Sequence, residues 1–222
     1  MLPIFTLQVI IPTMKTELLS QRLSLPYLQK NVKEVERAPT IPVELRPLID
    51  NFYASAEEIV AKISQLPPYP EQQRTGGVLA ISRQDENPFA EIREVGRVTA
   101  VNPDSEAELD RNKIDKYFVF AFAKMATVIG NGIFSSRSNI LFPGNYQNKI
   151  GEAVVPAGAI RLMTDAFGPV VVSFSGYTMD DDEVVILAAA VKSDLIKRST
   201  ADSLASTLGN PRYEQIIDRL LV

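Results

Sequence analysis

Two pairs of apolar segments, each pair joined by a short turn, constrain the fold of this chain most strongly. The segments are rich in Val, Ile and Phe, as strands are, and Gly, Pro, Asn and Asp lie between them. A short turn joins antiparallel strands, because a parallel connection needs a crossover of about a dozen residues or more. The sequence therefore predicts an antiparallel sheet built from two hairpins. The first pairs Gly76–Ser82 with Phe89–Thr99, and the second pairs Ala157–Thr164 with Pro169–Ser175.

Helical patterns alternate with these hairpins. Glu44–Leu66 repeats apolar residues at helical spacing on one face. Ser105–Ile129 begins with charged residues and becomes apolar around its whole circumference from Tyr117 onward, and a third helix runs from Asp180 to Ile196. A helix that is apolar all round is buried on more than one side. We therefore predict an α/β (α+β) fold with helices on both faces of the sheet.

The residue types that the chain lacks exclude several classes of chemistry. Its 222 residues include no histidine and no cysteine. This excludes a Ser-His-Asp or Cys-His nucleophilic unit and a zinc site made of Cys and His. A net charge of −4 argues against a nucleic-acid partner, and no apolar run reaches the roughly 20 residues of a membrane-spanning helix. We expect a cytoplasmic protein with neither a nucleic-acid nor a membrane partner.

The positions of prolines, glycines and helical patterns along the chain predict three regions. Residues 1–43 are interrupted by prolines and form an N-terminal extension that wraps the main domain. Residues 44–196 hold the sheet and its helices. Residues 197–222 form a C-terminal tail with two short helical segments, Ser203–Leu208 and Pro211–Leu221, separated by Gly209-Asn210.

An acidic cluster opens the third predicted helix and supplies the first candidate site residues. Asp181, Asp182 and Glu183 follow closely on Ser175 and Gly176, which end the last strand. Clustered carboxylates suit a hard cation, but successive helix positions point in different directions. The pattern therefore favours a role at the helix N-terminus, where carboxylates complement the helix dipole, and no metal site is predicted.

Two basic residues are further candidates. Lys124 is the lone charged residue in an apolar stretch, where a desolvated lysine can act as a base or form a Schiff base. Its alternative is to pair with a carboxylate or to reach the surface. Arg137 lies in the Gly-, Ser- and Asn-rich loop Gly130–Lys149, where a guanidinium among hydroxyls and amides suits a carboxylate or phosphate ligand. Its alternative is a solvated loop or a contact between subunits.

The element order and the stretch Pro169–Ala190 (PVVVSFSGYTMDDDEVVILAAA) resemble the GlcG/HbpS-like family. Members of that family end their last strand in Ser-Gly and open the final helix with an acidic cluster. The hairpin VLAISRQDENPFAEIREV is similar to the family's first strand pair. The resemblance covers residues 44–196. It implies a profilin-like, five-stranded antiparallel sheet between helices, in a homo-oligomeric binding module with no established reaction.

We therefore expect a non-enzymatic homo-oligomer that binds a small molecule or cofactor of open identity. Its ligand would be a small anion between the long loop and the start of the last helix. The predicted ligand-binding residues are Lys124, Arg137, Ser175, Gly176, Asp181, Asp182 and Glu183. Two alternatives stay open: an enzyme that uses Lys124 or the acidic cluster, and a structural subunit whose N-terminal extension attaches to a neighbour.

Overall fold

The computed structural model describes residues 41–72, 74–85, 88–97, 107–141, 149–150, 153–166 and 168–222. Of the N-terminal extension predicted over residues 1–43, residues 1–40 lie outside this described part. Residues 142–148 of the predicted long loop also lie outside it. The same holds for residues 98–99 of the second predicted strand and residues 105–106 of the second predicted helix.

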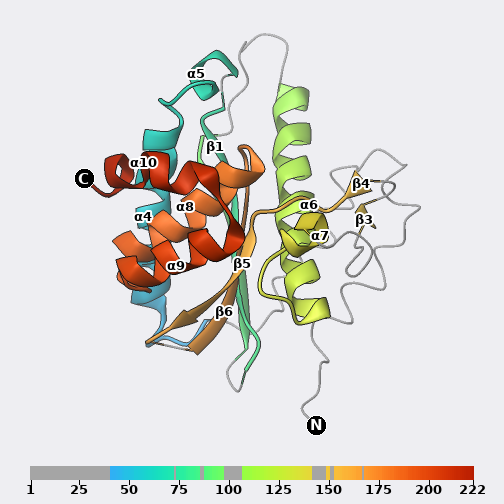
Figure 1. Cartoon of the computed structure of the whole chain (residues 1–222). Coiled ribbons are helices and arrows are strands. Elements are labelled where there is room, and N and C mark those ends of the chain that lie inside the picture. Colours follow the sequence, from blue (N-terminus) through green and yellow to red (C-terminus); the bar gives the residue numbers. More distant parts are fainter. Residues whose placement is uncertain are drawn as a thin grey trace.

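A four-stranded antiparallel sheet forms the centre of the fold (Figure 1). Its strands are β1 (Gly76–Arg83), β2 (Phe89–Gly96), β5 (Ala159–Thr164) and β6 (Gly168–Ser175). They lie in the order β2-β1-β6-β5, and each neighbouring pair is antiparallel. Both predicted hairpins are confirmed. The second hairpin returns beside the first, so β1 and β6 are the central strands.

The expectation of five strands is corrected to four within the described part of the chain. Beyond β5, the segment after α6 forms only one isolated β-bridge, between Ser135 and Ile160. Its backbone hydrogen bonds run from the Arg161 N–H to the Phe134 carbonyl at 2.8 Å and from the Ser136 N–H to the Ala159 carbonyl at 3.0 Å. This segment is short because the chain turns into α7 (Ser138–Leu141) directly afterwards. The remaining strands, β3 (Lys149–Ile150) and β4 (Ala153–Val154), pair with each other in a separate sheet.

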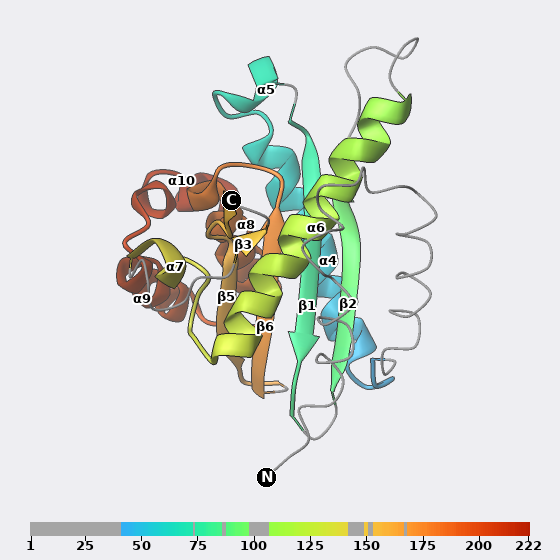
Figure 2. The same cartoon turned by 90° about the vertical axis from the view of Figure 1, so that its right-hand side faces the viewer.

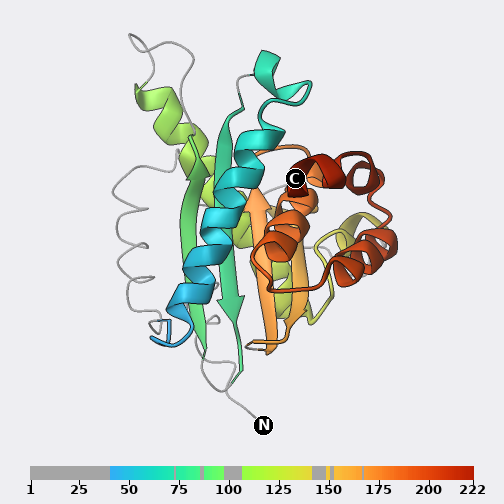
Figure 3. The same cartoon turned by 90° about the vertical axis from the view of Figure 1, so that its left-hand side faces the viewer.

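Helices cover both faces of the sheet, as the sequence predicts. Helix α6 (Ala107–Asn131) crosses one face, while α4 (Arg46–Ile63) and α8 (Met179–Lys192) cover the other (Figure 2). The view from the opposite side shows α4 lying across β1 and β2, with α8 beside it (Figure 3). The structure is therefore a mixed α+β sandwich.

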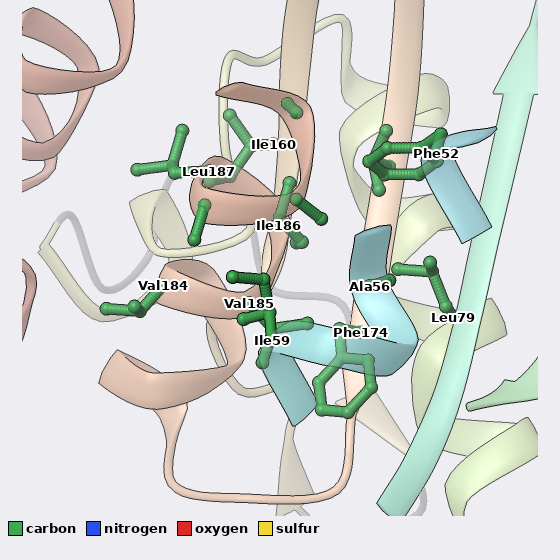
Figure 4. Packing of buried hydrophobic residues seen from close by; sticks show 14 of the residues in the cluster. Phe52, Ala56, Ile59, Leu79, Ile160, Phe174, Val184, Val185, Ile186 and Leu187 are labelled. Atoms are coloured by element: carbon green, nitrogen blue, oxygen red, sulfur yellow. The ribbon is translucent and has the colours of Figure 1, made fainter. Parts of the chain in front are cut away.

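The main hydrophobic core lies between the sheet, α4 and α8. Figure 4 shows Ile59 of α4, Val185 of α8 and Phe174 of β6 meeting at its centre, and all three are fully buried. Residues 184–190 of α8 are each 0% exposed, because α10 (Pro211–Leu221) covers the side of α8 that faces away from the sheet. Burying one such aliphatic or aromatic side chain contributes about 1.5–3 kcal/mol.

The all-round burial that the sequence predicts for the second helix is found in α8 instead. In α6, the sheet-facing Met125 and Val128 pack against Ala80 and Val171. Phe118 and Phe122, four residues apart, lie on one side of α6 and Phe120 lies on another, and all three are half-buried. These rings therefore remain partly accessible in the single chain.

The C-terminal helices α9 (Arg198–Leu208) and α10 pack back onto the domain. Tyr213, Ile216, Ile217 and Leu220 of α10 all belong to the main core. Lys62 of α4 donates from Nζ to the carbonyl of Leu220 at 2.9 Å. The turn between α9 and α10 lies against the N-terminus of α8, as described below.

Glycines allow a close approach of β1 and the end of β6. A Cβ on Gly77 would lie 2.4 Å from the carbonyl oxygen of Ser175, and a Cβ on Gly176 would lie 2.7 Å from the carbonyl oxygen of Gly76. No other residue fits these positions without a backbone shift. This approach brings the start of β1, the end of β6 and the start of α8 together at one end of the sheet.

Candidate functional site

The seven predicted site residues come together around the N-terminus of α8. They arrive from four places in the chain: α6 supplies Lys124, the segment after α6 supplies Arg137, the end of β6 supplies Ser175 and Gly176, and α8 supplies Asp181, Asp182 and Glu183. Thr178 caps α8, with its side chain accepting from the Asp181 N–H. The four acidic side chains at the start of α8, Asp180 to Glu183, point in different directions, as the sequence predicts, and they form three separate groups of contacts.

The first group is a buried ion pair between Lys124 and Asp182. The Lys124 Nζ lies 2.6 Å from Asp182 Oδ2 and donates to the Phe174 carbonyl at 2.8 Å. The exposed fractions of the two residues are 1% and 2%. Burial raises the pKa of Asp182 above its usual value, and the positive charge of Lys124 opposes that rise. This pair confirms one of the two alternatives for Lys124, the one in which it meets a carboxylate.

The second oxygen of Asp182 holds the turn that connects β6 to α8. Asp182 Oδ1 accepts hydrogen bonds from the backbone N–H of Tyr177 at 2.8 Å and of Gly176 at 3.2 Å. Gly158 closes the other side of the pair, with φ at +115°. A Cβ at this position would lie 2.8 Å from Lys124 Nζ and 2.9 Å from the Cβ of Asp182. The pair is therefore enclosed by backbone on two sides.

The second group joins Glu183 to Arg137 and Asn210. The Arg137 guanidinium donates to both carboxylate oxygens of Glu183, from Nε at 3.0 Å and from Nη2 at 2.6 Å, and it also bonds Asp180. Asn210 Nδ2 donates to Glu183 Oε2 at 2.9 Å. Burial raises the pKa of Glu183, and its bonds to Arg137 and Asn210 lower it in opposition. Arg137 is thus paired within the chain rather than solvated in a loop.

The third group surrounds Asp181. The Tyr69 hydroxyl donates to Asp181 Oδ2, and Arg212 Nε donates to Oδ1 at 3.1 Å. Tyr69 is fully buried and packs against Tyr177, with the ring centroids 4.5 Å apart and the rings tilted by 46°. Burial and the bond to Asp181 raise the pKa of the Tyr69 hydroxyl. This group fastens α5 (Tyr69–Gln72) and the start of α10 to α8.

These contacts define what the arrangement can do chemically. The Lys124 Nζ contacts a carboxylate at 2.6 Å and a backbone carbonyl at 2.8 Å, so this amine is engaged in the packing of α6 against β6 and α8. Within the described residues, no three carboxylates are arranged to hold a metal ion. None of the described helices has the length and apolar character needed to cross a membrane. The network is a rigid polar platform whose charges are largely balanced internally.

Several residues of this network were missed by the sequence reasoning. Asn210 is the most informative, because it caps α10 through Oδ1, which accepts from the N–H of Arg212 and Tyr213, and also bonds Glu183. The pair Asn210-Pro211 is a clear helix-start signal, so the cap could have been found from the sequence. The sequence holds no local pattern that would place Tyr69, Gly158 and Arg212 in this network, because their partners lie far away in the chain.

Compared with protein-family models, with curated proteins and with solved structures, the chain matches none. The functional argument therefore rests on the geometry of the described residues.

Proposed function

We propose that this chain is a non-enzymatic module that binds a small molecule and associates with copies of itself in the cytoplasm. The observation that carries the proposal is the state of Lys124. Its amine is held between a carboxylate and a backbone carbonyl, at 1% exposure. The residue best suited to covalent chemistry is thus used to build the fold.

The platform around α8 supports a binding role, because it is preorganised. Arg137, Asn210 and Arg212 fix three segments on one helix end, so the surrounding surface is held in one arrangement before a ligand arrives. Preorganisation lowers the entropy cost of binding. A linker or an unstructured tail would gain nothing from a fixed surface of this kind.

The fold is compatible with the resemblance to the GlcG/HbpS-like family. The isolated bridge of Ser135 beside β5 occupies the place where a fifth strand would extend the sheet. We propose that the domain is a profilin-like variant in which this fifth position is reduced to a single bridge. The Ser175-Gly176 end of β6 and the acidic start of α8 support this proposal.

Self-association is supported by the half-buried rings of α6. Phe118, Phe120 and Phe122 are half-buried in the single chain. Phe118 and Phe122, four residues apart, lie on the same side of the helix. A second copy packed against that side would bury these two rings further, and a symmetric pair places identical surfaces against each other. Light scattering during size-exclusion chromatography tests this point. A monomer at all accessible concentrations would refute it.

The test of the binding role uses the full chain and a library of small metabolites. We expect at least one compound to raise the thermal midpoint, because a ligand at a hundred times its Kd adds about 2.7 kcal/mol to the free energy of unfolding. Mass spectrometry of the same mixture should recover that compound unchanged. Turnover that is lost in Lys124→Met but kept in Lys192→Met would refute the non-enzymatic function.

A further inference from the structure

Arg74 differs from the basic residues that surround the start of α8. Lys124, Arg137 and Arg212 each meet a carboxylate. Arg74 is half-buried, and its guanidinium makes no hydrogen bond and no ion pair in the part of the chain that the structure describes. Only its backbone is fixed, since its N–H donates to the Tyr69 carbonyl at 3.1 Å. A half-buried guanidinium without a partner is a group that an anion would satisfy.

Tyr117 supplies a second unused group on the helix that faces Arg74. It is half-buried on α6, and its hydroxyl has no hydrogen-bond partner among the described residues. It precedes Lys124 by seven residues, which is two helical turns and about 10 Å along the same face. Because Lys124 bonds the carbonyl of Phe174, Tyr117 lies beyond it, toward the end of β6.

Arg74 leads into β1 and Tyr117 lies on α6, and these two elements pack against each other. Burial raises the pKa of the Tyr117 hydroxyl, the positive charge of Arg74 lowers it, and the negative charge of Asp182 raises it. The guanidinium, the hydroxyl and the buried ion pair are therefore within electrostatic range of one another. The charge of Asp182 is balanced by Lys124 at 2.6 Å, so it opposes a bound anion only weakly.

Strand alternation adds the hydroxyl of Ser175 to the same face. Ser173 Oγ donates to the Ala121 carbonyl of α6 at 2.7 Å, so Ser173 faces α6. Ser175 follows two residues later and faces the same way. Gly76, two residues after Arg74, carries no side chain between the strand ends and α6. Arg74 precedes β1, Tyr117 lies on α6 and Ser175 ends β6, and α6 packs against both of these strands.

We propose that Arg74, Tyr117 and Ser175 bind a small oxyanion, a carboxylate or a phosphate. The guanidinium supplies a planar pair of donors, and the two hydroxyls supply single donors. The inference rests on the proposed binding function and gives it a ligand class. It moves the predicted anion site from Arg137, which is occupied by Glu183 and Asp180, to Arg74.

The test titrates the full chain with inorganic phosphate and, separately, with succinate, and follows backbone amide shifts by NMR. We expect saturable binding of at least one anion in the millimolar range, with the largest shifts at the start of β1 and the end of β6. The arm that saturates identifies the source as a phosphate or a carboxylate. Arg74→Gln should weaken binding about tenfold or more, and Tyr117→Phe and Ser175→Ala by about threefold each.

Arg97→Gln is the matched control. Arg97 is exposed at the same end of the sheet, and its N–H donates to the Thr75 carbonyl at 3.2 Å. Val95, two residues earlier, packs in the main core, which lies between the sheet, α4 and α8. The loss of Arg97 removes the same charge and should change affinity by less than about twofold.

Two outcomes would overturn the inference. One is the absence of saturable binding for both anions. The other is an equal loss of affinity in Arg74→Gln and Arg97→Gln, which would show a general charge effect. If neither anion binds but a library compound stabilises the parent chain, the binding function stands and this anion site falls. If neither anion and no library compound binds, both proposals fall.

Discussion

Removing one partner of the buried pair is the sharpest test of how this fold is held together. In Lys124→Met the methionine fills the volume of the lysine stem, while Asp182 keeps only the N–H groups of Tyr177 and Gly176 as partners. Leaving one buried charge unpaired costs about 3–5 kcal/mol. We expect this loss of unfolding free energy at neutral pH, out of a total of about 5–15 kcal/mol for a domain.

The double variant Lys124→Met/Asp182→Asn completes a thermodynamic cycle. The amide introduced by Asp182→Asn would still offer an oxygen to the two backbone N–H groups, and no unpaired charge would remain buried. The double variant should therefore lose about 2 kcal/mol less than the sum of the two single variants. The chain has no tryptophan, so urea unfolding followed by far-ultraviolet circular dichroism is the suitable assay.

The pH dependence of Lys124→Met gives a second readout. Burial already raises the pKa of Asp182 in the parent chain, and loss of the ammonium raises it further. A carboxyl whose folded-state pKa is raised contributes stability below its unfolded pKa, and that contribution is lost as pH rises through the folded pKa. The difference in unfolding free energy between the parent chain and Lys124→Met should therefore become smaller as the pH falls from neutral toward the usual pKa range of Asp.

Lys192→Met is the control for this experiment. Lys192 meets Glu58 at 3.0 Å, but the Glu58 side chain is 60% exposed. Such a pair contributes less than about 1 kcal/mol. The reasoning is refuted if Lys124→Met lies within about 0.5 kcal/mol of the parent chain, or if the two single losses add up to the loss of the double variant.

Three further predictions concern the surroundings of the pair. Gly158→Ala should lower the unfolding free energy by about 3 kcal/mol, because φ is +115° and the new Cβ meets atoms at 2.8–3.0 Å. The control Gly209→Ala, where φ is 61° and the space around the new Cβ is open, should lower it by about 1 kcal/mol. Equal shifts of the thermal midpoint in the two variants would contradict this prediction. Asn210→Ala should lower the free energy of unfolding in urea by about 2 kcal/mol, because the cap of α10 and the hydrogen bond to Glu183 are both lost. Asn210→Asp should be more stable in mild acid than at neutral pH. A stability of Asn210→Asp that does not change with pH would count against the contact with Glu183. Arg137→Met should lower the free energy of unfolding by about 3 kcal/mol at neutral pH, because it leaves the buried Glu183 without its guanidinium. The loss should be smaller in acid, because burial already raises the pKa of Glu183 and the carboxyl then becomes protonated. A loss of unfolding free energy that stays constant with pH would argue against this contact.

Local signals account for the elements that the sequence predicts well. The bounds predicted for Pro211–Leu221 agree with α10, because Gly209 and Asn210 mark the end of one helix and the start of the next. The preceding helix begins at Arg198 rather than at the predicted Ser203, since Lys197 provides no side-chain cap as a signal. The hairpins are marked by their turns, but the placement of β6 beside β1 has no local marker.

The same limit applies to the site. The sequence brings together the acidic start of α8 and the Ser-Gly end of β6, because these residues are neighbours in the chain. It does not predict that Asp182 meets Lys124, 58 residues away, or that Glu183 meets Asn210, 27 residues away. Such pairings depend on how the helices pack, which residue spacing within one element does not determine.

The helix end that gathers α5, α6, the segment after α6 and the α9–α10 turn has a consequence for local opening motions. Each of these segments contributes a side chain to the same carboxylate cluster, so none of them can separate from α8 without leaving a buried acid unmatched. Their amide protons should therefore exchange with solvent as one cooperative unit, with a common opening free energy close to that of α8. Segments at the chain's surface that would open individually in another protein are here expected to open only together with α8, its most deeply buried helix.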